Sequence, residues 1–360
     1  MVIPSFEPII GGAERQLKQL SQFLLSDSDN FKVTILTRRV DSLPKYQVCD
    51  SIPTIRLIGR LYPHLFLLHL FLHLKKKMKD IDVIHVHTLN SPAVLCVIFG
   101  LLYKKPVILK VTRSGSGSQI AQIIASKFKS NLYRFILNSA SKVIALTKDV
   151  QSDLDKLSVK KEKVDLIPNG VQSFPYKEKI LEKVIFIYIG RLIKRKNVNV
   201  LLSAWSKANV GPDCELRIIG DGPELSSLLN LSKRLGIQSS VHFLGGLAHQ
   251  DVLEELQKSQ VFVLPSESEG MSNALLEAMS TVNAVIVSNI RANSEIIVNG
   301  KHGLLFDGEQ QLATAIKHLS TDHNTIHMLS LNAKDLVDTR FSFNVVSKMY
   351  KILYLELCKR

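Results

Sequence analysis

The sequence predicts an α/β protein built from two parallel-sheet domains. Its 360 residues are more than one ordinary hydrophobic core accommodates. Short apolar runs rich in Val and Ile alternate with helix-like stretches, which is typical of parallel sheets covered by helices on both faces. Midway, the turn signal Pro168-Asn169-Gly170 precedes a polar stretch, 171–183, that is the best linker candidate. We therefore expect one domain over 1–174 and a second over 175–340.

The apolar runs are the expected strands. In the first domain they occupy 32–37, 83–88, 106–112 and 142–147, and in the second 184–190, 215–220, 240–245, 261–265 and 284–288. The last twenty residues, 341–360, place apolar side chains at helical spacing, namely Val346, Met349, Tyr350, Leu353 and Leu357. This spacing predicts an amphipathic helix that docks its apolar face.

The composition of the chain limits the classes of partner and cellular location to be considered. A net charge of +14 calls for an anionic partner, which nucleic acid, a phosphorylated substrate or an acidic membrane would supply. No zinc-finger, RNP or homeodomain pattern is present, so charge alone is weak evidence for nucleic acid. The four cysteines are scattered, as expected for reduced thiols of a cytosolic protein. We find neither a membrane-spanning run nor a secretory signal in the sequence.

The stretch 261–281, VFVLPSESEGMSNALLEAMST, places Glu269 and Glu277 eight positions apart. It predicts a strand over 261–265, a loop over 266–271 and a helix that starts near Ser272. Backbone amides at such a helix start favour a diphosphate, and flanking carboxylates can hold sugar hydroxyls. Two glutamates at this spacing are common by chance among 32 acidic residues. The pair is informative only through its position, beside the predicted helix start.

Two further stretches can bind anions. IGRLIKRKN (189–197) sets Arg191 and Lys196 on the loop after a strand, where open α/β sheets bind ligands. Arginine binds phosphate with two hydrogen bonds, and lysine acts as a point charge. Taken alone, however, the stretch 189–197 is better interpreted as a solvated basic loop. Gly11 and Gly12 precede a helix-like run, where amides approach an anion closely, but an ordinary tight turn explains them equally well.

Taken together, these stretches resemble the retaining glycosyltransferases of family 4, which have the GT-B fold. The resemblance runs along nearly the whole chain through GGAER, IDVIHVHT, IPNGV, IGRLIKRK, IIGDGPE, VHFLGG, PSESEGMSNALLEAMS and EIIVNGKHGLLF. The two glutamates within this order are highly specific, whereas the glycine turns are not. The resemblance implies two Rossmann-like domains facing across a cleft, with a nucleotide-sugar donor between them and no required metal. It also implies that the helix over 341–360 crosses back to the N-terminal domain.

The resemblance implies roles for the residues that match. Arg191 and Lys196 would hold the donor diphosphate, and Gly12 would close on it from the other domain. Catalysis would rest on positioning by Glu269 and on charge stabilisation of the leaving diphosphate by Arg191 and Lys196.

The remaining roles concern the sugar and the nucleoside. Glu269 and the amides of Gly270, Met271 and Ser272 would hold the donor sugar. Glu277 would accept hydrogen bonds from the ribose hydroxyls. Leu247, in the turn after FLGG, would meet the base through its backbone.

The sequence departs from the family pattern in three places. Many relatives carry a His after the strand that matches 106–112, where Thr112 falls here, so Arg113 or loop amides would fill that role, or activity is weakened. Relatives usually have a Gly-x-Pro turn where this chain has Val282-Asn283-Ala284. The family's first strand has several residues before VIPSF, whereas Met1 begins mid-strand. We expect the natural protein to start upstream, or this chain to be poorly stable.

Two features of the first domain have competing interpretations. His85 and His87 share one strand face, but no third ligand has suitable spacing, so we expect core histidines and no metal. The stretch 61–79 is apolar on nearly all sides and ends in lysines. As a helix its apolar part is shorter than a bilayer core of roughly 30 Å. It is either a buried helix or a contact with a membrane surface.

The sequence thus predicts a cytoplasmic hexosyltransferase-type enzyme. It would move a sugar with retention from a nucleoside-diphosphate sugar to a hydroxyl, in cell-envelope polysaccharide or glycolipid biosynthesis. The expected partners are the donor, a lipid-linked or glycan acceptor and an anionic surface at the inner face of the plasma membrane, without nucleic acid. The alternatives are a GT-B sugar-nucleotide epimerase or hydrolase, and a non-catalytic nucleotide-sugar-binding protein. The base, the sugar and the linkage stay open.

Overall fold

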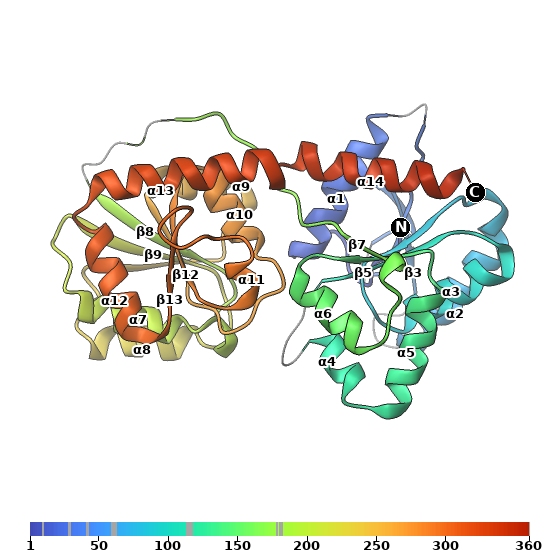
Figure 1. Ribbon diagram of the computed structural model, residues 1–360, viewed down its shortest axis with the longest axis horizontal. Helices are drawn as coiled ribbons and strands as arrows, with labels where there is room; N and C mark the ends of the chain where they lie inside the picture. Colours follow the sequence, from blue (N-terminus) through green and yellow to red (C-terminus); the bar gives the residue numbers. More distant parts are fainter. Residues whose placement is uncertain are drawn as a thin grey trace. The chain divides into compact units, whose positions relative to one another are not determined.

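The chain forms two compact α/β units. The computed structural model describes residues 1–8, 11–27, 30–40, 43–58, 63–112, 118–177, 179 and 183–359. Unit 1 comprises Met1–Asn169 with Val346–Arg360, and unit 2 comprises Gly170–Val345 (Figure 1). Unit 2 begins a few residues before the predicted boundary because Val171 already pairs with its far end. The Val171 N–H donates to the Phe341 carbonyl (2.9 Å), and the Phe343 N–H donates to the Val171 carbonyl (2.7 Å).

Unit 1 contains a mostly parallel sheet in two parts, ordered β1-β3-β2 and β4-β5-β6-β7, in which only β2 runs antiparallel to its neighbour. Its strands are β1 (Ile35–Arg38), β2 (Tyr46–Cys49), β3 (Ile52–Leu57), β4 (Ile84–Val86), β5 (Val107–Val111), β6 (Lys142–Ala145) and β7 (Val164–Leu166). Its helices are α1 (Gly12–Leu25), α2 (Pro63–Lys77), α3 (Ser91–Tyr103), α4 (Gln119–Ile124), α5 (Lys127–Ser139), α6 (Lys148–Lys156) and α14 (Phe343–Cys358), whose residues from Val346 onward belong to unit 1.

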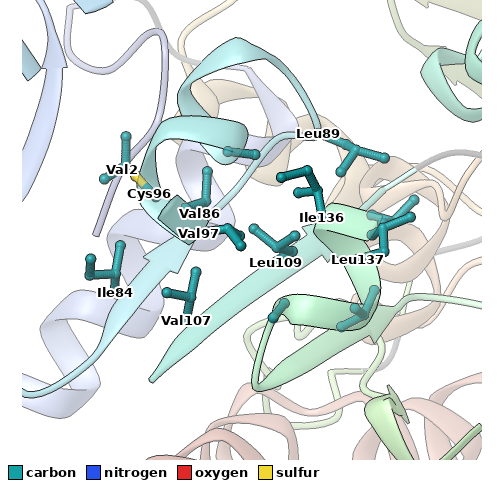
Figure 2. Close-up of a cluster of buried hydrophobic side chains, with 14 of the residues drawn as sticks. Val2, Ile84, Val86, Leu89, Cys96, Val97, Val107, Leu109, Ile136 and Leu137 are labelled. Atoms are coloured by element: carbon teal, nitrogen blue, oxygen red, sulfur yellow. The ribbon is translucent and has the colours of Figure 1, made fainter. Parts of the chain in front are cut away.

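A single residue, Val2, connects the two parts of this sheet. It forms parallel bridges to Leu36 in β1 and to Val86 in β4. Its N–H donates to the His85 carbonyl (2.8 Å), and its own carbonyl accepts from the His87 N–H (3.0 Å). Figure 2 shows the Val2 side chain in the buried apolar cluster that continues along β4 and β5. The sheet is therefore continuous at the level of this one residue.

The helices of unit 1 form two layers, because successive strand residues point to opposite faces. Helices α2 to α6 pack on one face, through side chains that include Phe66, Val97, Ile136 and Val150. Helix α1 packs on the other face, and α14 lies on that face too (Figure 1). The Tyr354 hydroxyl of α14 contacts the His85 ring there. The helix predicted at the C-terminus thus docks its apolar face on unit 1, burying Val346, Tyr350, Leu353, Tyr354 and Leu357.

A buried basic cluster lies under α14. His85 and His87 have ring centroids 4.1 Å apart, and the Nδ1 atom of His85 lies 2.6 Å from the Tyr354 hydroxyl. The Lys110 Nζ lies 5.5 Å from the centre of the Tyr350 ring. Burial lowers the pKa of Lys110 to about 8, and burial followed by the nearby positive charge lowers the pKa of both histidines well below the usual value. The prediction of core histidines is confirmed.

Unit 2 contains a six-stranded, fully parallel sheet in the order β10-β9-β8-β11-β12-β13. Its strands are β8 (Val184–Ile189), β9 (Cys214–Ile219), β10 (Val241–Gly245), β11 (Val261–Leu264), β12 (Ala284–Ser288) and β13 (Leu304–Phe306). Its helices are α7 (Val198–Ala208), α8 (Leu225–Arg234), α9 (His249–Lys258), α10 (Asn273–Ser280), α11 (Arg291–Ser294), α12 (Gly308–Leu319) and α13 (His323–Leu336), followed by a π-helical turn, Val337–Phe341. Helices α7, α8 and α12 cover one face, and α9, α10 and α13 cover the other (Figure 1).

The α/β fold class predicted from the alternating pattern is confirmed. All five strands expected in the second domain are present as β8 to β12. In unit 1 the expected strands correspond to β1, β4, β5 and β6, while β2, β3 and β7 were not predicted. Strand β2 exposes three of its four side chains, so it lacks the apolar run that identifies a buried strand.

Candidate active site

The sheet of unit 2 has a topological switch point between β8 and β11. From β8 the chain proceeds outward through β9 to β10, and then returns to β11 on the other side of β8. Because the connections on the two sides run in opposite directions, a crevice forms at the carboxyl ends of these two strands, where open α/β sheets bind ligands. The loop with Arg191 and Lys196 follows β8, and the loop with Glu269 follows β11. Both predicted loops therefore lie at the switch point.

The loop after β8 is held by the turn after β9. The Gly190 N–H donates to the Ile219 carbonyl (3.0 Å), and the Leu192 N–H donates to the Asp221 carbonyl (2.8 Å). At Gly220 φ is +141°, and a Cβ there would overlap the Gly190 carbonyl oxygen. The Gly-Asp-Gly turn thus permits a close approach of two loops.

Lys196 and Glu269 form a close ion pair. The Lys196 Nζ lies 2.5 Å from the Glu269 Oε1, and their side chains are only 13% and 9% exposed. Arg195 supports the same loop: its guanidinium donates to the Ser268 carbonyl and lies 3.7 Å from the Glu269 Oε2. With Arg191 exposed on the same loop, cations outnumber carboxylates in this group. A diphosphate is the kind of ligand that this balance favours.

A buried tyrosine lies beneath this ion pair. The Tyr188 hydroxyl donates to the Arg191 carbonyl (3.3 Å), and its ring is fully buried. Burial and the nearby Glu269 carboxylate raise the pKa of Tyr188, so it stays a neutral donor. A Cβ at Gly190 would come within 2.8 Å of the Tyr188 hydroxyl oxygen, so a larger residue at position 190 would displace this hydroxyl. Tyr188 thereby fixes the backbone that carries Arg191.

Helix α10 begins where the sequence predicted. Ser272 is its N-cap, and the Ser272 hydroxyl accepts a hydrogen bond from the Leu275 N–H (3.3 Å). Gly270 and Met271 precede the cap, so the backbone N–H groups of the first turn point to the carboxyl edge of the sheet. The partial positive charge of this helix start adds to the charge of Lys196. The predicted anion-binding features thus lie close together within unit 2.

Glu277 has a partner that the sequence analysis missed. The carboxylate lies on the second turn of α10 and is 7% exposed, and its Oε1 lies 3.1 Å from the Nε2 of His249. His249 is the first residue of α9, two positions after Leu247. The available signal was a histidine at a helix start directly after the FLGG turn. Because 28 residues separate the two side chains, spacing along the chain does not reveal their contact.

Leu247 lies in the loop that follows β10. The Gly220 N–H donates to the Gly245 carbonyl (2.8 Å), which holds this loop beside the turn after β9. Gly245 has φ +68°, and the Leu247 side chain is 36% exposed. The loop therefore lies at the same carboxyl edge as Arg191 and Lys196.

The other predicted residues lie in unit 1 or outside the described residues. Gly12 is the first residue of α1, whose N-cap is Gly11; the Gly11 N–H donates to the Glu14 side chain (3.1 Å). Thr112 directly follows β5. Arg113, the suggested substitute for the family histidine, lies outside the described residues. Across the part of the chain that the structure describes, no three His, Cys, Asp or Glu side chains are grouped as metal ligands.

The turn after α10 is strained because a residue other than glycine has a positive φ there. Val282 has φ +61°, and its N–H donates to the Met279 carbonyl (3.2 Å), while the Asn283 N–H donates to the Ala278 carbonyl (3.0 Å). These two bonds form a Schellman motif, whose left-handed residue is usually glycine. The Asn283 amide also donates to the Leu256 carbonyl (3.0 Å), which holds the turn against the end of α9. Val282 thus adds conformational energy to the turn, and the hydrogen bonds of the motif are still formed.

One cavity lies away from this site. It has a volume of about 610 Å³ and lies in unit 1, at the amino ends of β1 and β4, where Met1, His73 and Tyr354 contribute to its lining. Ligands of parallel α/β sheets bind at the opposite, carboxyl edge. The candidate site therefore lies on the loops of unit 2.

Two family models match consecutive parts of the chain. Residues 10–173 match the model described as Glycosyltransferase Family 4, and residues 172–336 match the model described as Glycosyl transferases group 1. A galactosyltransferase of Escherichia coli, UDP-Gal:alpha-D-GlcNAc-diphosphoundecaprenol alpha-1,3-galactosyltransferase, is 27% identical over 97% of this chain and 95% of its own length. N-acetyl-alpha-D-glucosaminyl L-malate synthase of Bacillus anthracis is 23% identical over 78% of this chain and 76% of its own.

Solved structures show the same fold. Alr3699/HepE of Anabaena, determined in complex with UDP, is 19% identical and superposes with a TM-score of 0.81 over 99% of this chain and 98% of its own. A glycosyltransferase of Rickettsia africae is 18% identical and superposes with a TM-score of 0.80 over 100% of this chain and 98% of its own. At this identity the likeness shows the GT-B fold alone. Together with the two family models, it places this chain among the glycosyltransferases of family 4, as the order of its motifs predicted.

Proposed function

We propose that this glycosyltransferase transfers a hexose, with retention of anomeric configuration, from a nucleoside-diphosphate sugar to a hydroxyl group. The observation that carries the proposal is the Lys196–Glu269 ion pair beside the start of α10, at the switch point of the sheet. A diphosphate bound at this helix start lies within reach of the lysine, and the sugar it carries lies within reach of the carboxylate.

Each residue of the site then has one task. Lys196, Arg191 and the amides at the start of α10 stabilise the charge that develops on the leaving diphosphate, and this kind of stabilisation is usually the largest single contribution to catalysis. Glu269 accepts hydrogen bonds from sugar hydroxyls and fixes the sugar relative to the breaking bond. Glu277, oriented by His249, accepts from the ribose hydroxyls. The backbone beside Leu247 faces the base.

The acceptor that we propose is a lipid-linked glycan of the cell envelope. The name of the Escherichia coli relative specifies a diphosphoundecaprenol-linked acceptor, and this relative matches almost the whole chain. No helix among the described residues is both long and apolar enough to cross a membrane. We therefore propose a peripheral position at the inner face of the plasma membrane, supported by the net charge of +14 and by the lysines at the end of α2.

A donor screen tests the proposal. The full chain is incubated with UDP-, GDP- and ADP-hexoses and a short-chain lipid-diphosphate acceptor, with UDP-galactose first because of the named relative. We expect an acceptor-dependent product that keeps the anomeric configuration of the donor, with no loss of rate in EDTA. Isomerised donor, or free sugar released equally with and without acceptor, would instead indicate an epimerase or a hydrolase. Donor binding without turnover would indicate a binding protein.

A further inference from the structure

The positive charge of this chain is concentrated in one part of unit 1. Residues 51–148 contain fifteen lysines and arginines against only Asp80 and Asp82, a net charge of +13 out of +14 for the whole chain. No Asp or Glu occurs between residues 83 and 148. This segment includes α2, α3 and α5. The rest of the chain is close to neutral in total, so its long-range attraction to an extended anionic surface originates mainly in this segment.

The same three helices expose large apolar side chains. We call this set the apolar face; its members are Leu68, Phe71 and Leu72 of α2, Ile98, Leu101 and Leu102 of α3, and Phe128, Leu132 and Phe135 of α5. Three of them protrude most: Phe128 is 79% exposed, Leu102 71% and Phe135 61%. Single exposed apolar residues are ordinary, but a cluster on adjacent helices marks an interaction surface.

The three helices lie side by side in one layer (Figure 1). Their inner sides pack into the same buried cluster, through Phe66 of α2, Val97 of α3 and Ile136 of α5. The Phe71 ring of α2 meets the Phe99 ring of α3 edge to face, with centroids 5.3 Å apart, and α3 in turn contacts α5. Because their inner sides share one core, their exposed residues lie on the outer surface of that layer.

Lysines border the apolar face. They lie at the end of α2, directly after α3 and at the start of α5, and are Lys75, Lys76, Lys104, Lys105, Lys127 and Lys129. Apolar side chains surrounded by lysines are typical of helices that lie in the headgroup region of a membrane. Protein interfaces are depleted in lysine, and two copies of such a face would repel each other. An anionic lipid surface is the partner that this chemistry fits.

We propose that the apolar face docks unit 1 on anionic phospholipid, with α2, α3 and α5 lying flat and Leu102, Phe128 and Phe135 entering the headgroup region. This inference rests on the proposed function only in that a lipid-linked acceptor is found at such a surface. It also identifies a wider surface than the stretch 61–79 predicted from the sequence, because α3 and α5 contribute its most exposed residues.

Vesicle co-sedimentation tests the surface. The full chain should bind vesicles of phosphatidylcholine with phosphatidylglycerol at low salt, and should lose binding in high salt or with phosphatidylcholine alone. The variant Leu102→Ser/Phe128→Ser/Phe135→Ser should bind the anionic vesicles at least about tenfold more weakly. The matched control, Ile352→Ser/Leu229→Ser/Met328→Ser, removes exposed apolar residues elsewhere and should bind like the parent.

A second pair of variants tests the charge. Lys127→Gln/Lys129→Gln should weaken binding by roughly ten- to thirtyfold, since each lysine near an anionic surface contributes about 1 kcal/mol, or about fivefold in affinity. The control Lys233→Gln/Arg234→Gln removes the same charge from exposed residues of α8 and should have little effect. UDP affinity and transfer to a soluble acceptor should stay at the parental level in all four variants, which separates this inference from the proposed function.

Several results would overturn the proposal. These are a parent that does not sediment with anionic vesicles at low salt, an apolar-face variant that binds like the parent, and lysine variants that weaken binding equally in unit 1 and unit 2. Sedimentation velocity tests a further result that would overturn the proposal, namely self-association through the apolar face. If the parent self-associates and the apolar-face variant is monomeric, while vesicle binding is absent, the face contacts a second copy of the chain.

Discussion

The Lys196 ammonium and the Glu269 carboxylate lie 2.5 Å apart, although 73 residues separate them in the chain. Each is a proposed ligand of the donor, and each neutralises the other when no donor is bound. The diphosphate of a donor therefore competes with Glu269 for the lysine. This competition gives the two side chains opposite effects on nucleotide affinity.

Replacing Glu269 should separate binding from turnover. In Glu269→Gln the lysine keeps its full charge for the diphosphate, so UDP affinity should be equal to or higher than that of the parent. Single-turnover transfer should fall by roughly a hundredfold, because the interaction with the sugar is lost where it is strongest, in the transition state. Lys196→Gln is the comparison and should weaken UDP by about 1.5–3 kcal/mol. Parental transfer by Glu269→Gln would remove its assignment to the sugar.

His249 should act on nucleotide binding only through Glu277. Glu277→Gln should weaken UDP by roughly ten- to a hundredfold, since it loses a charged hydrogen bond to the ribose. His249→Ala should weaken it less, because the carboxylate keeps its charge and loses its orientation. Calorimetry on both single variants and on the double variant gives the coupling energy. Effects that add independently would show that His249 does not position Glu277.

Unit 1 should lose stability in mild acid. Burial holds His85 and His87 neutral and lowers their pKa well below the usual value, with Lys110 adding repulsion. In the unfolded chain a histidine has a pKa near 6.5. Below that pH the unfolded state binds protons that the folded state does not bind, so the free energy of unfolding decreases as the pH falls. The loss is at most about 2 kcal/mol for each histidine between pH 6.5 and 5.

Hydrogen exchange of peptides from β4 and β5 measures this effect in unit 1. Protection should be constant between about pH 6.5 and 8 and should fall between pH 6.5 and 5, after correction for the intrinsic exchange rate. His87→Leu should reduce the slope, whereas the exposed His327→Gln should leave it unchanged. Because Lys110 has a pKa of about 8 when folded and about 10.5 when unfolded, protection should rise again from pH 8 upward. A flat profile in the parent would contradict the account of the cluster.

Because the turn after α10 is strained, replacing Val282 by glycine should cost less stability than the same replacement of another buried valine. Val282 and Val285 are both buried, but only Val282 has positive φ, which costs a non-glycine residue roughly 1–2 kcal/mol. Val282→Gly should therefore destabilise unit 2 by about 1–2 kcal/mol less than Val285→Gly. Urea unfolding followed by the fluorescence of Trp205, the single tryptophan, reports on unit 2. Equal costs for the two changes would show that the turn carries no strain.

Local sequence carried most of the information on the fold of unit 2. Each strand from β8 to β12 is a continuous apolar run, and Ser272 has the hydroxyl that an N-cap requires, so both the strands and the start of α10 were predictable. The elements that were missed are shorter or less deeply buried. Strand β13 has only three residues, two of them partly exposed.

The contacts within the site were less predictable, because they join side chains from distant loops. The positions of Lys196 and Glu269 followed from the ends of two strands, but their ion pair depends on β8 and β11 being neighbours, which the order of strands along the chain does not give. His249 was missed for the same reason. In α2 the nearly uniform apolar composition hid the fact that one side is buried and another is exposed.

Helix α14 has a consequence for biosynthesis. Its residues from Val346 complete unit 1, yet the ribosome makes them only after the whole of Gly170–Val345. At about 5–20 residues per second, the 176 residues of unit 2 take roughly 10–35 s to translate. During that interval His85 and His87 lack the tyrosines that cover them, so nascent unit 1 presents an open, partly polar surface to chaperones. A stop codon before Val346 would leave that surface open permanently, even though every strand of both sheets has been made.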